Sequence, residues 1–150
     1  MAESRSTREH FAFFHPLRVR WNELDPQGIV FNPNYFVYAD IAFGEYARAL
    51  DFVYPEGFAR YGSDTFAVHA EATFVASAKY DDVLDLGTRI AYLGNTSFRA
   101  LVGIFRGEEL LTETRLTYVN AAIDGRKSMP LPDEFVRKVE ALERVAPQRK

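Results

Sequence analysis

The chain of 150 residues contains no cysteine, which excludes disulfide bonds, thiolate nucleophiles and cysteine-ligated metal sites. Histidine is also scarce. The three residues of this type, His10, His15 and His69, are too scattered along the sequence to predict a metal site or a catalytic triad. The lack of cysteine fits a reducing compartment. We therefore expect no metal ion in this protein.

Several sequence signals of other protein classes are missing as well. No Gly-x-Ser-x-Gly elbow of a serine esterase occurs, and no Gly-x-Gly-x-x-Gly or Walker A pattern indicates a nucleotide, so we expect no cofactor. The net charge of −3, without a dense Lys/Arg cluster, argues against nucleic acid. No apolar run approaches the ~18 residues of a membrane span, and residues 1–10 lack the apolar segment of a signal peptide. These features predict a soluble cytoplasmic protein that binds no membrane.

Aromatic residues, in contrast, are abundant, with 13 Phe and 8 Tyr. They could form an aromatic core, a subunit interface or a pocket for an apolar acyl group. The length predicts one domain over residues 1–150, of which 1–10 read as a mobile leader.

The hydrophobic pattern predicts a strand at 12–21, a turn at 22–32 and a helix from Pro33 to about Leu50. This helix is apolar around most of its girth, so we expect a sheet that wraps around it. Four more strands are expected at 64–75, 83–93, 96–106 and 109–121, joined in part by tight hairpins, with a short amphipathic helix at 132–145. One central helix and an antiparallel run of strands indicate an α+β fold.

The turn before the helix carries the candidate chemistry. Asp25 is followed by Pro26 and Gly28, which bend the chain just before the helix start. Backbone N–H groups at a helix start lack internal partners and carry the positive end of the helix dipole. A carboxylate facing such donors suits attack on a carbonyl, with the N–H groups holding the oxyanion. The alternative is a turn aspartate that only hydrogen-bonds its own backbone.

The same segment resembles a known family. Asp25-Pro26-x-Gly28-Ile29-Val30, followed by Pro33-Asn34-Tyr35, is similar to the signature of the 4-hydroxybenzoyl-CoA thioesterase branch of the hotdog-fold superfamily. Residues 77–84, the turn at 124–126 and Leu131-Pro132 extend the resemblance to roughly residues 14–135. It implies a hotdog fold, in which an antiparallel sheet wraps around one long helix, and an acyl-CoA thioesterase that works as a homodimer or homotetramer. The sheets would join edge to edge, with active sites at the subunit interface.

The resemblance also assigns roles to residues. Asp25 would act as nucleophile or as general base on water, and the backbone N–H of Asn32 would bind the oxyanion, although Asn is also a favoured N-cap. Asp40 would contact the hydroxyl of a hydroxybenzoyl group, or else pair with an Arg or a backbone group. Thr65 would reach the site from the neighbouring subunit. Together the expected substrate contacts are Gly28, Pro33, Tyr35, Asp40 and Thr65.

Coenzyme A contacts are expected at the basic turn that contains Arg126 and Lys127, which is otherwise an ordinary solvated hairpin turn. The acyl group would be aromatic, of the hydroxybenzoyl type, or short-chain. Two other functions stay open at this point. A hotdog dehydratase or hydratase would need a histidine, and none lies between residues 22 and 50. A non-catalytic acyl-CoA-binding module would keep the pocket without hydrolysis.

Overall fold

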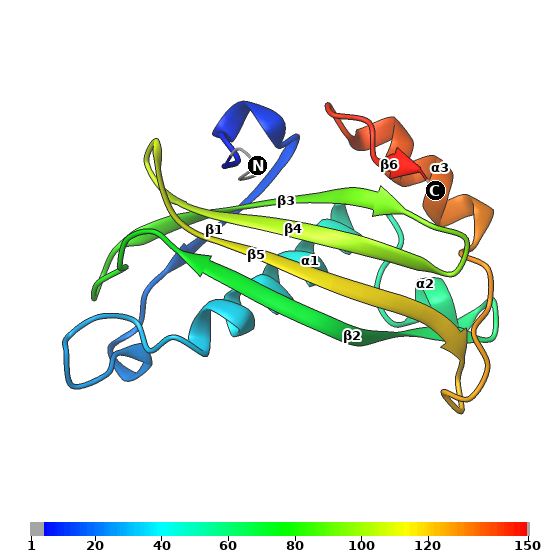
Figure 1. Cartoon of the computed structure of the whole chain (residues 1–150), viewed down its shortest axis with the longest axis horizontal. Helices are drawn as coiled ribbons and strands as arrows, with labels where there is room; N and C mark the ends of the chain where they lie inside the picture. Colours follow the sequence, from blue (N-terminus) through cyan, green and yellow to red (C-terminus); the bar gives the residue numbers. More distant parts are fainter. Residues whose placement is uncertain (1–4, 150) are drawn as a thin grey trace.

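A computed structural model describes residues 5–149, and it shows a curved six-stranded sheet with one long helix on its concave face (Figure 1). The strand order is β1-β3-β4-β5-β2, all antiparallel, and β6 lies parallel beside β3. The elements are η1 (Arg8–His10), β1 (Phe13–Arg18), η2 (Trp21–Glu23), α1 (Asn34–Ala49), α2 (Glu56–Ala59), β2 (Ser63–Phe74), β3 (Val83–Leu93), β4 (Ser97–Arg106), β5 (Glu109–Ala122), α3 (Asp133–Leu142) and β6 (Gln148–Arg149).

The sequence pattern predicted most of this architecture. The α+β class, the central helix, the four strands after it and the surface helix are confirmed, with ends that differ by a few residues. The first strand is shorter than expected, because the chain turns into η2 at Trp21, where the Glu23 carboxylate accepts the Arg20 N–H at 2.7 Å. The two-residue strand β6 was not predicted. None of the helices formed by residues 5–149 is long and apolar enough to cross a membrane.

The helix α1 is held in the curve of the sheet by aromatic packing. The ring of Phe43 stacks on Phe98 of β4 and Tyr118 of β5, with centroids 5.7 Å and 5.0 Å apart. Burying a side chain of this size stabilises a fold by roughly 1.5–3 kcal/mol. Burial around the helix is not complete, however, since Val37 and Asp40 stay exposed in the single chain.

The N-terminal segment covers part of the other face of the sheet. Phe11 is fully buried there against Leu101 and Phe105, so the middle of β4 is buried on both faces. The sequence predicted a mobile leader over residues 1–10. Residues 1–4 lie outside the described residues, and the remainder of this segment contacts the sheet. Ser6 donates to Glu113 at 3.0 Å, and Arg8 pairs with Asp85 at 3.0 Å.

A partly buried carboxylate, that of Glu143, closes a gap in the hydrogen bonding at the edge of β3. Strand β1 pairs with β3 as far as Thr88, and β6 pairs with β3 from Tyr92 onward. The N–H of Ile90, which lies between these two stretches of β3, therefore has no strand partner. Glu143, just after α3, accepts this N–H at 3.2 Å and the hydroxyl of Tyr46 at 3.2 Å. Burial raises the pKa of Glu143 to about 7, although both hydrogen bonds and the nearby charge of Arg89 favour its ionised form.

This pKa predicts a pH-dependent stability. Because the folded-state pKa lies above the usual 4.5, the stabilisation is complete below pH 4.5 and is lost as pH rises through 7. The loss is up to about 3 kcal/mol. We expect the melting temperature of the wild-type protein to fall between pH 5 and pH 8 by several degrees more than that of Glu143→Gln, whose amide keeps an acceptor but does not ionise. Parallel melting curves of the two proteins would contradict this role.

Candidate active site

The turn at Asp25 is fixed by its own backbone. The N–H of Asp25 donates to the carbonyl of Ile29 at 2.9 Å, and the N–H of Gly28 donates to the carbonyl of Asp25 at 2.9 Å. Gly28 has φ +76°, and no atom lies within 4 Å of where a Cβ would stand, so glycine is favoured here for its backbone conformation.

The two oxygens of the Asp25 carboxylate have different surroundings. Oδ1 accepts the N–H of Gln27 at 2.8 Å, which is the local turn role expected as the alternative. Oδ2 accepts no hydrogen bond from any residue between 5 and 149. The side chain is partly exposed, so this second oxygen is accessible to a ligand or a water molecule. The structural role and a chemical role are therefore compatible.

A second carboxylate, which the sequence analysis missed, ties this turn to α1. The Glu23 side chain is only 13% exposed, and its Oε1 accepts the Tyr38 hydroxyl at 2.9 Å. The carbonyl of Glu23 accepts the N–H of Phe31 at 2.9 Å and the side-chain amide of Asn34 at 2.9 Å. Glu23 is thus a positioning residue that holds both ends of the loop containing Asp25. The only sequence signal was its place two residues before Asp25.

The start of α1 offers a free donor. Among residues 5–149, nothing accepts the backbone N–H of Asn32, whereas the N–H of Asn34 donates to Phe31 at 2.8 Å and that of Tyr35 to Asn32 at 3.2 Å. The N-cap of α1 is Pro33, and the Asn32 side chain caps no N–H group, so the N-cap role considered for Asn32 is wrong. An exposed, unpaired N–H next to a helix start suits a developing negative charge.

This geometry can be compared with known proteins. The model of the thioesterase superfamily matches residues 27–113, more than half of the chain. The chain belongs to the thioesterase superfamily. It is a thioester hydrolase with the hotdog fold, as the resemblance implied.

Individual proteins of known structure or description agree with this membership. An Aquifex aeolicus protein named "Putative esterase" is 26% identical over 124 residues, which cover 83% of this chain and 94% of that protein. A gentisyl-coenzyme A thioesterase has a similar structure, with a TM-score of 0.74, 24% identity, and 82% and 98% of the two chains covered. A Synechocystis 1,4-dihydroxy-2-naphthoyl-CoA thioesterase has a TM-score of 0.77 at 21% identity, with 85% and 94% covered. The two structural likenesses show a shared fold.

Two of the expected substrate contacts of this thioesterase lie on the helix. Tyr35 is 2% exposed, and its hydroxyl accepts the N–H of Ala78 at 3.1 Å, so it packs in the core at the start of α1. Asp40 is exposed in the single chain, although it lies in an apolar stretch of the sequence. Its charge contributes, after burial, to raising the pKa of Tyr118 to about 12. It also contributes to the raised pKa of Tyr54, after burial and the Asp64 carboxylate.

Gly28 and Pro33 lie on the same loop as Asp25, whereas Thr65 and the expected coenzyme A contacts lie far from Asp25 within one chain. Thr65 is near the beginning of β2, and the exposed turn with Arg126 and Lys127 follows β5 beside it, since Ser63 pairs with Ala122. The loop before α1 lies at the other end of β2 (Figure 1). Twelve strand residues span about 36 Å. One chain alone therefore does not bring these residues to Asp25.

Proposed function

We propose that this thioesterase hydrolyses an acyl-CoA, with Asp25 as the reacting carboxylate and the Asn32 N–H as oxyanion donor. The observation that carries the proposal is the free Oδ2 of Asp25 on the same short loop as the free N–H of Asn32. Oδ2 either attacks the thioester carbon directly or takes a proton from a water molecule that attacks it. The carbonyl oxygen becomes an oxyanion, the C–S bond breaks, and coenzyme A leaves as the thiol after protonation. In the first route a water molecule then hydrolyses the mixed anhydride on Asp25 and releases the acid; in the second route the acid forms directly and the proton taken by Asp25 goes to the leaving thiolate.

The first test replaces Asp25 by Asn. The amide oxygen keeps an acceptor for the Gln27 N–H, so the turn should persist, while the nucleophile or base is lost. We expect turnover of a panel of acyl-CoA thioesters, followed with a thiol reagent, to fall by about 10²–10⁴. Circular dichroism and sedimentation should match the wild-type protein. Turnover within about twofold of wild type, with deamidation excluded, would remove Asp25 from the mechanism.

The exposed edge of the sheet supports a dimer. Among residues 5–149, strand β2 pairs with β5 alone, and it carries the exposed apolar side chains Phe66, Val68 and Phe74. A long, apolar, unpaired edge of this kind needs covering. A second copy offers the same unpaired backbone, and a two-fold pairing of two β2 strands is antiparallel.

Such pairing would complete the active site. It sets the beginning of the partner's β2 beside the end of this chain's β2, near the start of α1. The partner's Thr65 and its basic turn at 126–127 would then lie at the same end of the sheet edge as Asp25. The corresponding residues of the same chain lie about one strand length away, at the opposite end. In this dimer the basic turn no longer lies a strand length from Asp25, because it comes from the other subunit. Each site would then contain residues of two subunits.

Mixed dimers test this arrangement. We expect both Asp25→Asn and the double variant Arg126→Gln/Lys127→Gln to be impaired, the second chiefly in KM. After the two are unfolded and refolded together, half of the dimers should be mixed, and each mixed dimer has one intact site. Activity should return to about a quarter of wild type. If the mixture is no more active than the sum of its parts, Asp25 and the basic turn serve the site from one chain, or the turn has no role.

The acyl group is proposed to carry a hydroxyl at its far end. Asp40 lies six residues after Asn34, about 9 Å along the helix, and helical side chains lean back toward the N-terminus. A hydroxybenzoyl group spans roughly 6 Å from its carbonyl carbon to its hydroxyl oxygen. A carbonyl held near the helix start would direct that hydroxyl along α1 toward Asp40. The similar proteins named for gentisyl-CoA and dihydroxynaphthoyl-CoA also act on hydroxyaryl groups.

Substrate discrimination tests this assignment. A hydroxyl that donates to Asp40 gains a charge-assisted hydrogen bond, which benzoyl-CoA cannot form. We expect kcat/KM to be about tenfold or more higher for 4-hydroxybenzoyl-CoA than for benzoyl-CoA, and Asp40→Ala to shrink this ratio. Asp51→Ala, which removes another exposed carboxylate, should leave the ratio unchanged. Equal or faster hydrolysis of benzoyl-CoA or aliphatic thioesters would show that Asp40 has no such role.

A further inference from the structure

A pocket of about 550 Å³ lies on the face of the sheet opposite α1. Its floor includes Ala91 and Leu101, whose neighbours along the strands, Ile90 and Ala100, point into the core around α1. The N-terminal residues Ser6 and His10 form one wall. The other wall is the segment after α3, with Val145, Ala146 and Gln148. Figure 1 shows both terminal segments on the same side of β3.

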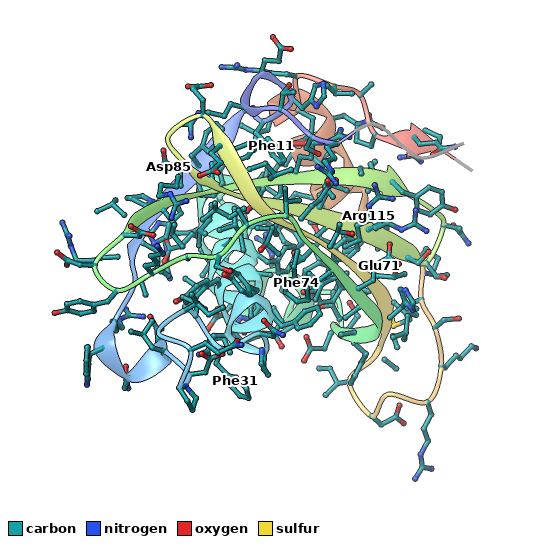
Figure 2. All side chains as sticks on the ribbon, turned by 60° about the vertical axis from the view of Figure 1, so that its left-hand side comes forward. Phe11, Phe31, Glu71, Phe74, Asp85 and Arg115 are labelled. Carbon is teal, nitrogen blue, oxygen red and sulfur yellow. The ribbon has the colours of Figure 1, made fainter. Side chains whose placement is uncertain are left out.

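Three arginines from three adjacent strands face this pocket. Leu101 of β4 pairs with Arg89 of β3 on one side and with Arg115 of β5 on the other, so the two guanidinium groups flank it on one face. Arg99 lies two residues from Leu101 on β4 and therefore on the same face. Figure 2 labels Arg115 on this sheet and also Phe11, which covers the neighbouring part of the same face. Like charges this close on one sheet face repel each other.

The acidic residues nearby leave Arg89 and Arg99 without a carboxylate partner among residues 5–149. Glu113 is the only carboxylate that lines the pocket within the described chain, and it is already bound by Ser6 at 3.0 Å and Arg115 at 3.6 Å. Glu143 lies close enough to Arg89 to interact with its charge, but among residues 5–149 neither Arg89 nor Arg99 has a carboxylate within 4 Å. The guanidinium of Arg99 instead lies 5.6 Å from the ring centre of Tyr92.

Arg89 has a buried hydrogen-bond donor without an acceptor. Its Nε is buried, and no group of the described chain accepts a hydrogen bond from it. A buried donor without an acceptor costs about 1–3 kcal/mol, which an oxygen of a bound anion would offset. Guanidinium groups match the oxygens of phosphate with paired hydrogen bonds. The volume also falls within the range of small-molecule sites, and the floor is partly apolar.

We propose that this pocket binds an organic phosphate with more than one negative charge, held by Arg89 and Arg99. The site is separate from the proposed active site, because the sheet stands between the pocket and α1. It does not depend on Asp25 or on the basic turn at 126–127. The phosphate oxygens would accept hydrogen bonds from the Arg89 Nε and the Arg99 guanidinium, and the apolar floor would contact the organic part.

Titration calorimetry with pyrophosphate and with ADP tests the proposal. Pyrophosphate carries only the charge, and ADP adds a body that fills the remaining volume. We expect saturable binding of both, with ADP at least as tight as pyrophosphate. Arg99→Gln, at an exposed position that is safe for folding, should weaken both by about tenfold, and Arg89→Gln/Arg99→Gln should abolish binding.

Two control variants locate the site. Arg48→Gln/Arg137→Gln removes the same charge from surfaces outside the pocket and should leave the affinity within about twofold. Arg126→Gln/Lys127→Gln should also leave it unchanged, which separates this pocket from the proposed coenzyme A contacts. The proposal is wrong if the wild-type protein shows no saturable binding, or if binding survives the double arginine variant. It is also wrong if that variant changes the oligomeric mass while pyrophosphate and ADP do not bind to the wild-type protein, since the arginines would then belong to a subunit contact.

Discussion

The packing of α1 into the curve of the sheet is the constraint on which the rest of this structure depends. Phe43 stacks on Phe98 of β4 and on Tyr118 of β5, and this contact restricts the rotation and the axial position of the helix. The start of α1 is thereby held beside the end of β2, where the ring of Tyr35 packs on Phe74. The N–H groups at the helix start are useful to chemistry only because the aromatic core keeps them in a defined place.

The two carboxylates in the loop before the helix, Glu23 and Asp25, have different surroundings. The Glu23 side chain is nearly buried, and its carboxylate accepts hydrogen bonds from the Arg20 N–H and the Tyr38 hydroxyl, which joins the loop to α1. One carboxylate oxygen of Asp25 accepts a hydrogen bond within its own turn, and the other oxygen accepts none among the described residues. This arrangement is compatible with the proposed reaction at one oxygen of Asp25 and a structural role for the other. The free oxygen is held at a fixed place because the other oxygen and the neighbouring carboxylate are already bound.

The sequence predicted what depends on local pattern. Alternation in 83–93 and 96–106, the apolar girth of the helix and the turn at Asp25 all have short-range signals, and the structure confirms these elements. It did not predict what depends on distant partners. The role of Glu23 requires Tyr38, the burial of Glu143 requires the edge of β3, and the exposure of Asp40 follows from how little of α1 one sheet covers. The arginines on the outer face lie on three strands, and no motif in the sequence brings them together.

The length of β2 links assembly to chemistry in this fold. A strand of twelve residues separates the start of α1 from the turn after β5 by more than the length of an acyl-pantetheine arm, so one chain cannot use both ends of its own sheet edge on one substrate. An antiparallel pair of such edges brings opposite ends together twice, once on each side of the two-fold axis. The same unpaired backbone that makes the edge a liability for a single chain thus gives a simple route to two equivalent composite sites. The proposed pairing would not use the outer face of the sheet, so it would leave the arginine pocket there accessible to a ligand.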